Sequence, residues 1–183
     1  MKKTIAVFAA LAVFLLAASA TGAQTNPVVL SPSDAWVTVD GVSAASEYTA
    51  TAEIGKTKLS LARDKDNLYV SITGDTTGWI AVGFGSLRMD GAFLFICFVG
   101  ADGKAQGKLQ TGKGHTHADV ASEALVQFAM KEAGGVTTLE LVLKASSVIA
   151  KDATSLPVIW AVGTSDSFSA LHKARGSLTL TLK

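Results

Sequence analysis

Period-two alternation of apolar and polar residues is the feature that most constrains the fold of this 183-residue chain. Such alternation places one side of each strand on a core and the other side in solvent. Most of the chain after residue 35 follows it, most clearly in residues 59–63, 68–73, 125–130, 136–143 and 178–182. Turn signals rich in glycine, aspartate and asparagine separate these runs. The pattern therefore predicts an all-β protein.

Two segments, 79–84 and 92–99, are apolar almost without interruption. We interpret them as central strands that are covered on both faces. The number and spacing of the runs predict an immunoglobulin-like β-sandwich of about ten or eleven antiparallel strands. Helical signal is confined to one short turn within residues 144–152. We expect residues 35–183 to form a single domain.

The first residues have the order of an export signal. Lys2 and Lys3 precede an uncharged apolar run over residues 5–18, and small residues follow it. That run, about 14 residues, is shorter than the roughly 20 that span a bilayer, so a cleaved signal peptide is favoured over an anchor. We predict that residues 1–23 are removed, with cleavage after Ala20 or Ala23. The product is expected in a bacterial periplasm or secreted, without stable membrane insertion.

Between this signal and the domain, residues 24–34 are predicted to form an extended leader, because Pro27 and Pro32 discourage regular structure. Cleavage also removes Lys2 and Lys3, which lowers the formal net charge from +1 to −1. A chain so close to neutrality lacks the basic surface of a nucleic-acid binder. Its 49% hydrophobic content excludes a disordered protein.

Cys97 is the single cysteine, so no intramolecular disulfide is possible, and its place in an apolar run predicts a buried thiol. No Cys-x-x-Cys-His sequence is present, which excludes covalently attached c-type haem. No nucleotide-binding loop or nucleophile elbow is recognisable, so we do not expect an enzyme in its own right.

Two residues stand out as possible metal ligands, one through a soft thioether sulfur and the other through an imidazole nitrogen. Met89 lies between Arg88 and Asp90 in a loop, which is unusual for a methionine that fills a core. His172 comes just before the last strand. Each residue alone is more often structural, and composition does not show that the two meet.

A second group comprises His115, His117 and Asp119, which would share one face if they lie on a strand. The pattern offers a zinc or copper site as an alternative hypothesis. A polar loop is the competing interpretation, since Gly112 and Gly114 precede the group.

Several motifs in order resemble the DOMON family, named after dopamine β-monooxygenase-type domains. The opening Asp40-Gly-Val-Ser-Ala-Ala-Ser-Glu-Tyr48 resembles the family's first conserved segment. Thr77-Gly-Trp-Ile-Ala-Val-Gly-Phe-Gly85 looks like its best-known motif, and Met89-Asp-Gly-Ala92 follows it as in bacterial members. The closing block is similar at 157–163 and 172–176. Together these pieces span nearly all of the chain after the predicted signal.

The resemblance implies a β-sandwich and, in the cytochrome branch of the family, non-covalent haem b held between a methionine and a histidine. Those positions match Met89 and His172. The expected function is electron transfer, as a small carrier or as a subunit of a larger redox enzyme. The expected partner is a redox protein or a membrane electron-transfer component. Thioether ligation would raise the reduction potential relative to two histidines.

A porphyrin would need an apolar pocket, and aromatic side chains could form its walls. Many of these side chains are nevertheless expected to belong to an ordinary core. The candidate walls are Trp79, Phe84, Phe93, Phe95, Trp160 and Phe168. Cations that could pair with the haem propionates are Arg175, Lys173 and Arg88.

Two alternatives stay open. Lys173 or His117 could serve in place of His172 as the nitrogen ligand. Other members of the family are thought to bind sugars or other small ligands without haem. The sequence therefore also permits a haem-free module for a carbohydrate or small ligand.

Overall fold

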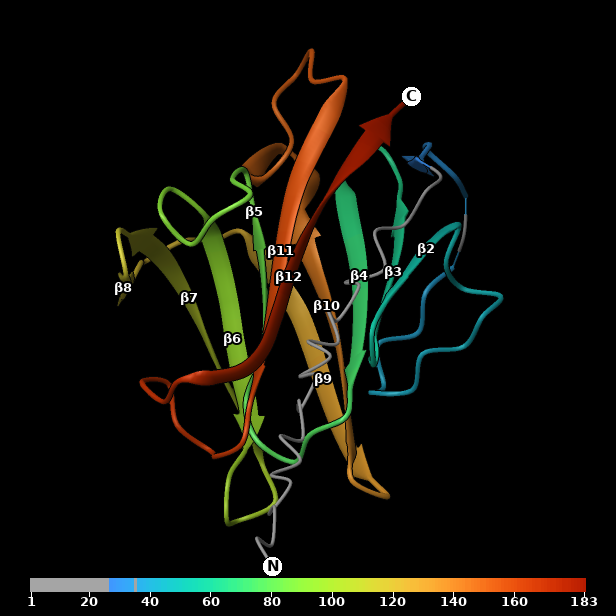
Figure 1. Ribbon diagram of the computed structural model, residues 1–183. Helices are drawn as coiled ribbons and strands as arrows, with labels where there is room; N and C mark the ends of the chain where they lie inside the picture. Colours follow the sequence, from blue (N-terminus) through green and yellow to red (C-terminus); the bar gives the residue numbers. More distant parts are fainter. Residues whose placement is uncertain (1–26, 35) are drawn as a thin grey trace, which may run out of the picture.

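A computed structural model describes residues 27–34 and 36–183, so the predicted signal peptide lies outside the described residues. Two β-sheets pack face to face, which confirms the predicted all-β sandwich (Figure 1). The seven-stranded sheet has the order β1-β12-β11-β5-β6-β7-β8, and the five-stranded sheet has the order β2-β3-β4-β10-β9. Among the described residues, no helix has the length and apolar character to cross a membrane.

The strands of the larger sheet are β1 (Val28–Leu30), β5 (Ile80–Phe84), β6 (Phe93–Val99), β7 (Ala105–Lys113), β8 (Thr116–Asp119), β11 (Ser155–Gly163) and β12 (His172–Leu182). Those of the smaller sheet are β2 (Ala50–Ile54), β3 (Thr57–Arg63), β4 (Asn67–Gly74), β9 (Leu125–Ala133) and β10 (Val136–Lys144). One 3-10 turn, η1 (Ala145–Ser147), lies where the short helical turn was expected.

The described part of the chain forms 12 strands, slightly more than the predicted ten or eleven. One of them, β1, belongs to the segment predicted as a leader and pairs with β12 in parallel, whereas the other strand pairs are antiparallel. Pro27 and Pro32 flank this strand instead of interrupting it, so neither removes an amide from its three residues.

The main core lies between the sheets and is built from the inward-facing residues of both. Leu139, Leu141 and Leu143 alternate along β10 and are all buried in it. Removing a leucine side chain of this kind from water contributes on the order of 2 kcal/mol. Cys97 is buried in the same core, as predicted, and burial raises the pKa of its thiol.

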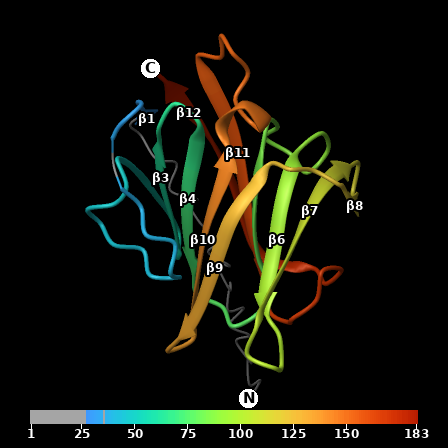
Figure 2. The same cartoon turned by 180° about the vertical axis from the view of Figure 1, so that it is seen from behind.

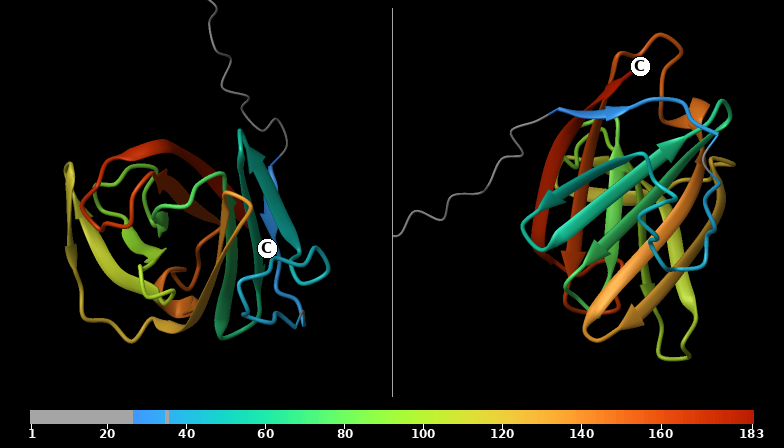
Figure 3. Two further views of the ribbon diagram at one scale, coloured as in Figure 1. Left: turned by 90° about the horizontal axis from the view of Figure 1, so that it is seen from below. Right: turned by 90° about the vertical axis from the view of Figure 1, so that its right-hand side faces the viewer.

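A second, smaller apolar cluster covers the other face of the larger sheet. Trp79, Ala81, Ile96 and Phe98 form it, and Phe168 packs onto Phe98 with ring centroids 4.7 Å apart. Strands β5 and β6 are consequently buried on both faces, which explains why their sequences are continuously apolar. The sheet itself is strongly curved, as the view from below shows (Figure 3).

A buried carboxylate fixes the segment before β2 to the five-stranded sheet. Leu139 and Leu141 face the core, so Glu140 between them points to the opposite face (Figure 2 shows this sheet). It is fully buried and accepts hydrogen bonds from Tyr48 Oη at 2.6 Å, Gly41 N at 2.9 Å and Asp40 N at 3.0 Å. Burial and the neighbouring Glu140 raise the pKa of the Tyr48 hydroxyl far above its usual value.

This anchor gives a physical reason for the opening motif. Its first two residues, Asp40 and Gly41, supply amides to Glu140, and its last residue, Tyr48, supplies the hydroxyl. Gly41 has a φ of +83°, and a Cβ there would lie 2.9 Å from the backbone of Met130. Only glycine adopts this positive φ and allows this close backbone contact without strain.

We expect Glu140→Ala to lower the free energy of unfolding by about 3 kcal/mol, because it leaves buried donors without an acceptor. Urea denaturation measures the change. Glu53→Ala, on an exposed position of β2, is the matched control and should change stability little. Equal stability of the two variants would contradict the anchoring role of Glu140.

Candidate functional site

A pocket of about 880 Å³ lies on the face of the seven-stranded sheet that is turned away from the main core. Its floor is made of small and aliphatic residues from three neighbouring strands, namely Ala81, Gly83, Leu94, Ile96, Ile159 and Ala161. Ala81 and Gly83 on β5 and Ala161 on β11 contribute little side-chain bulk to this floor. Leu94 and Ile159 lie beside Gly83, where a Cβ would be 2.4 Å from Leu94 and 2.9 Å from Ile159.

Two loops from opposite ends of the strands bound the pocket (Figure 1). The first, residues 85–92 between β5 and β6, carries Met89. The second, residues 164–171 between β11 and β12, leads into His172, the first residue of β12. Met89 and His172 both line the pocket, although they are far apart in the sequence. The structure therefore brings the two predicted ligands to one cavity.

The loop that carries Met89 is fastened to the β7–β8 hairpin. Gly91 and Gly112 pair through Gly91 N to Gly112 O at 3.1 Å, and Gly112 N donates to Ala92 O at 2.9 Å. Asp90 Oδ1 accepts a hydrogen bond from Gly114 N at 2.7 Å. A Cβ on Gly112 would lie only 1.7 Å from the Met89 carbonyl oxygen, so the close approach of loop and hairpin requires glycine there.

The second loop is held by backbone bonds at the start of β5. Trp79 N donates to Ser165 O at 3.1 Å, and Gly163 N donates to Trp79 O at 2.8 Å. The Trp79 ring occupies the space where a Cβ on Gly163 would lie, 2.0 Å from its indole nitrogen. Phe168 completes the attachment through its contact with Phe98.

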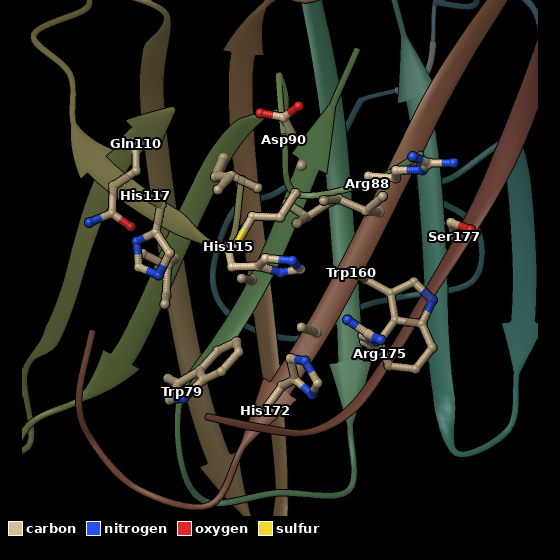
Figure 4. A pocket seen from close by; sticks show the side chains of 18 of the residues that line it. Trp79, Arg88, Asp90, Gln110, His115, His117, Trp160, His172, Arg175 and Ser177 are labelled. Atoms are coloured by element: carbon tan, nitrogen blue, oxygen red, sulfur yellow. The ribbon is translucent and has the colours of Figure 1, made fainter. Parts of the chain in front are cut away.

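Figure 4 shows how the predicted site residues lie in the pocket. Of these residues, Met89, His172, Trp79, Trp160, Arg175, Arg88, His115 and His117 line it. In the view of Figure 4, Gln110 and His117 lie on one side, Trp160 and Arg175 on the other, and His115 and His172 between them. The side chain of His172 is exposed.

Phe84 does not belong to the pocket, contrary to the sequence prediction. It is 1% exposed and packs in the main core, because it alternates with Gly83 on β5 and so faces the other sheet. Phe95 is buried in the same core, and Phe93 packs against it. Phe168 contacts the second cluster instead of the pocket.

The three residues of the alternative metal site are not assembled around one point. The Asp119 carboxylate instead accepts hydrogen bonds from Lys108 Nζ at 2.6 Å and Gln110 Nε2 at 2.7 Å. The hydrogen bond from Lys108, reinforced by that from Gln110, holds the pKa of Asp119 below its usual value. Within residues 27–34 and 36–183, no group of three or more His, Cys, Asp or Glu side chains is placed to hold a metal ion.

Of the three predicted cations, two face the pocket. Arg88 and Arg175 line it, and neither belongs to an ion pair within the described part of the chain. Lys173 does not line the pocket, and its amino group donates to the Asp75 carbonyl oxygen. This placement argues against Lys173 as a substitute for His172.

The sequence prediction missed several pocket residues. Gln110 is 4% exposed, and its Oε1 has no hydrogen-bond partner among the described residues. Nothing in an alternating strand marks such a glutamine in advance. Leu87 and Leu171 are 50% and 88% exposed at the edge of the pocket. The sequence could have indicated these two residues, since each is a leucine in a polar loop close to a predicted ligand.

Solved structures with the same fold include two cytochrome domains and a carbohydrate-binding module. The cytochrome domain of cellobiose dehydrogenase from Myriococcum thermophilum is 13% identical, with a TM-score of 0.56, over 73% of this chain and 82% of that one. The cytochrome b domain of pyranose dehydrogenase from Coprinopsis cinerea is 10% identical, with a TM-score of 0.52, over 68% and 76% of the two chains.

The carbohydrate-binding module is a family 9 module from Caldicellulosiruptor kristjanssonii in complex with cellotriose. It is 11% identical, with a TM-score of 0.53, over 86% of this chain and 94% of that one. No protein-family model matches the chain, and the comparison with curated proteins finds no match. At such identities the likeness shows a shared β-sandwich fold and nothing more specific.

We expect Gly112→Ala to displace the loop that carries Met89, since the added methyl group collides with a backbone oxygen. Overpacking of this kind costs about 1–3 kcal/mol of stability. Urea denaturation and amide NMR shifts of residues 85–92 measure the effect. Lys113→Ala, at the exposed neighbouring position, is the control. Unchanged shifts of the loop in the Gly112 variant would contradict this account.

Proposed function

We propose that this chain is an exported DOMON-type cytochrome domain that binds haem b non-covalently and transfers electrons. In this proposal Met89 and His172 would hold the haem iron. One observation carries it: a thioether from the loop 85–92 and an imidazole from the first residue of β12, near opposite ends of the strands, line a single pocket with an apolar floor. The fold shared with two cytochrome domains supports it.

The residues that line the pocket fit a haem group. The pocket volume lies within the roughly 300–1,000 Å³ of cofactor sites. Leu87 and Leu171 at its edge are exposed and would be covered by an apolar ring system.

Bound haem supplies reversible one-electron chemistry. Met89 and His172 would hold the iron between them, so that oxygen would find no free coordination site. The Met89 thioether would favour the reduced state relative to a second imidazole. Arg88 and Arg175, which are free of ion pairs within the described residues, would pair with the two propionates. The aliphatic floor would contact the apolar part of the ring.

The partner in this proposal is a redox protein or a membrane electron-transfer component in the periplasm or outside the cell. The open mouth of the pocket would give such a partner close access. The chain itself acts as a carrier or as a subunit of a larger redox enzyme.

A second candidate function is haem-free carbohydrate binding. The observation that favours it is the likeness to a module in complex with cellotriose, which covers more of both chains than the cytochrome matches do. The pocket also contains polar side chains suited to hydroxyl groups, among them Asp90, Gln110 and Ser177, beside Trp79 and Trp160.

Absorption spectroscopy of the purified protein with added haem tests the proposal. The native protein should give a six-coordinate, low-spin spectrum with a sharp α-band on reduction. His172→Ala should abolish this spectrum, and Met89→Leu should change it by removing the sulfur ligand; each variant should weaken haem binding at least about tenfold, since each removes one direct ligand.

Matched controls come from outside the proposed ligand pair. Met130→Leu removes a methionine that packs against the main core, and His117→Ala removes another pocket imidazole. Both variants should keep the native spectrum. A protein that ignores haem but binds cellotriose in a calorimeter would replace the cytochrome proposal with the second candidate. Native spectra in both ligand variants would overturn the ligand assignment.

A further inference from the structure

All three histidines of the chain line the same pocket, although the proposed function uses only one of them. Within the described residues, Nδ1 of His117 is buried without a hydrogen-bond partner. The side chains of His115 and His172 are exposed, so neither ring is packed into a core. The pocket thus holds one thioether and three imidazoles, more nitrogen ligands than a haem needs.

His115 lies on the Met89 side of the pocket. The hydrogen bond from Gly114 N to Asp90 Oδ1, 2.7 Å long, joins the immediate neighbours of Met89 and His115. The pairing of Gly91 with Gly112 fastens the same loop to the same hairpin. His172 begins β12, directly after the other loop, residues 164–171, which lies at the opposite end of the strands (Figure 1).

We propose that His115 is a second ligand for the axial position assigned to Met89, so that the pocket can hold haem either as Met89/His172 or as His115/His172. This inference rests on the proposed function. The exchange replaces one iron–sulfur bond by one iron–nitrogen bond. The imidazole binds in its neutral form, and neither proton nor electron is transferred.

The local structure favours His115 over His117 for this role. His115 occupies the turn of the β7–β8 hairpin, is exposed, and follows Gly114, whose φ is +58°. His117 lies on β8, where it pairs with Gly112 and has a buried Nδ1. A turn residue can move at lower cost than a residue held in a sheet ladder. In Figure 4 the ring of His115 is also nearer the middle of the pocket, whereas His117 lies beside Gln110.

The two ligand pairs differ chemically. Imidazole is a harder ligand than a thioether and stabilises the oxidised iron relative to the reduced iron. The His115/His172 form therefore has the lower reduction potential. The chain would then have two possible reduction potentials in one pocket. Which of them applies would depend on whether Met89 or His115 contacts the iron.

The test compares haem-loaded Met89→Ala with Met89→Ala/His115→Ala and Met89→Ala/His117→Ala. We expect Met89→Ala to keep a low-spin, six-coordinate spectrum with a reduction potential below that of the native protein. The additional loss of His115 should convert it to a five-coordinate, high-spin spectrum, whereas the loss of His117 should leave it low-spin. Free imidazole should restore the low-spin spectrum of the His115 double variant, which shows that its pocket is intact.

A second double variant, Met89→Ala/His115→Gln, keeps the size and polarity of the turn residue and should behave like the alanine variant. A high-spin Met89→Ala protein would overturn the inference while leaving the proposed function in place, provided that the native protein is low-spin. Loss of the low-spin spectrum in the His117 double variant would also overturn it. A native protein that binds no haem would overturn both proposals.

Discussion

The need to cover both faces of the seven-stranded sheet is the constraint on which the rest of this structure depends. One face packs against the five-stranded sheet, through a core that includes Leu139, Phe84 and Phe95. The other face is also apolar at β5 and β6, yet among residues 27–34 and 36–183 no further sheet lies over it. Loops 85–92 and 164–171 cover only part of it. The uncovered remainder is the pocket, so the site is a direct consequence of incomplete coverage.

That arrangement explains why one fold serves different ligands in its structural neighbours. The sheet provides a platform, whereas much of the chemistry comes from loops and strand ends at its edges. In this chain the loops and the adjoining strands β8 and β12 bring a thioether, imidazoles and two guanidinium groups to the platform, and our proposal assigns a haem to them. Glycines at 83, 112 and 163 are as important as these ligands, because each makes room for a close neighbour in the floor or the loops.

Sequence reasoning predicted the architecture well because period two reports directly on strands. The candidate site was recognised in part: Met89 was noted as a methionine in a polar loop, the family resemblance assigned Met89 and His172 as ligands, and the structure brings both to one pocket. Phe84 was misassigned, since an uninterrupted apolar run does not reveal which of its two faces meets the larger core. The role of Glu140 was also missed, because its partners Asp40, Gly41 and Tyr48 are distant in the sequence.

The sequence by itself determined the strands, their turns and the residue types available for chemistry, because these depend on local periodicity and on side-chain identity. Only the tertiary structure decided which residues share a cavity. It did so through contacts that no local pattern encodes: the fit of Gly112 against the Met89 carbonyl, the bond between Asp90 and Gly114, and the approach of the two loops from opposite ends of the sheet. These contacts join segments far apart in the chain, and their strength depends on spatial proximity and not on sequence order.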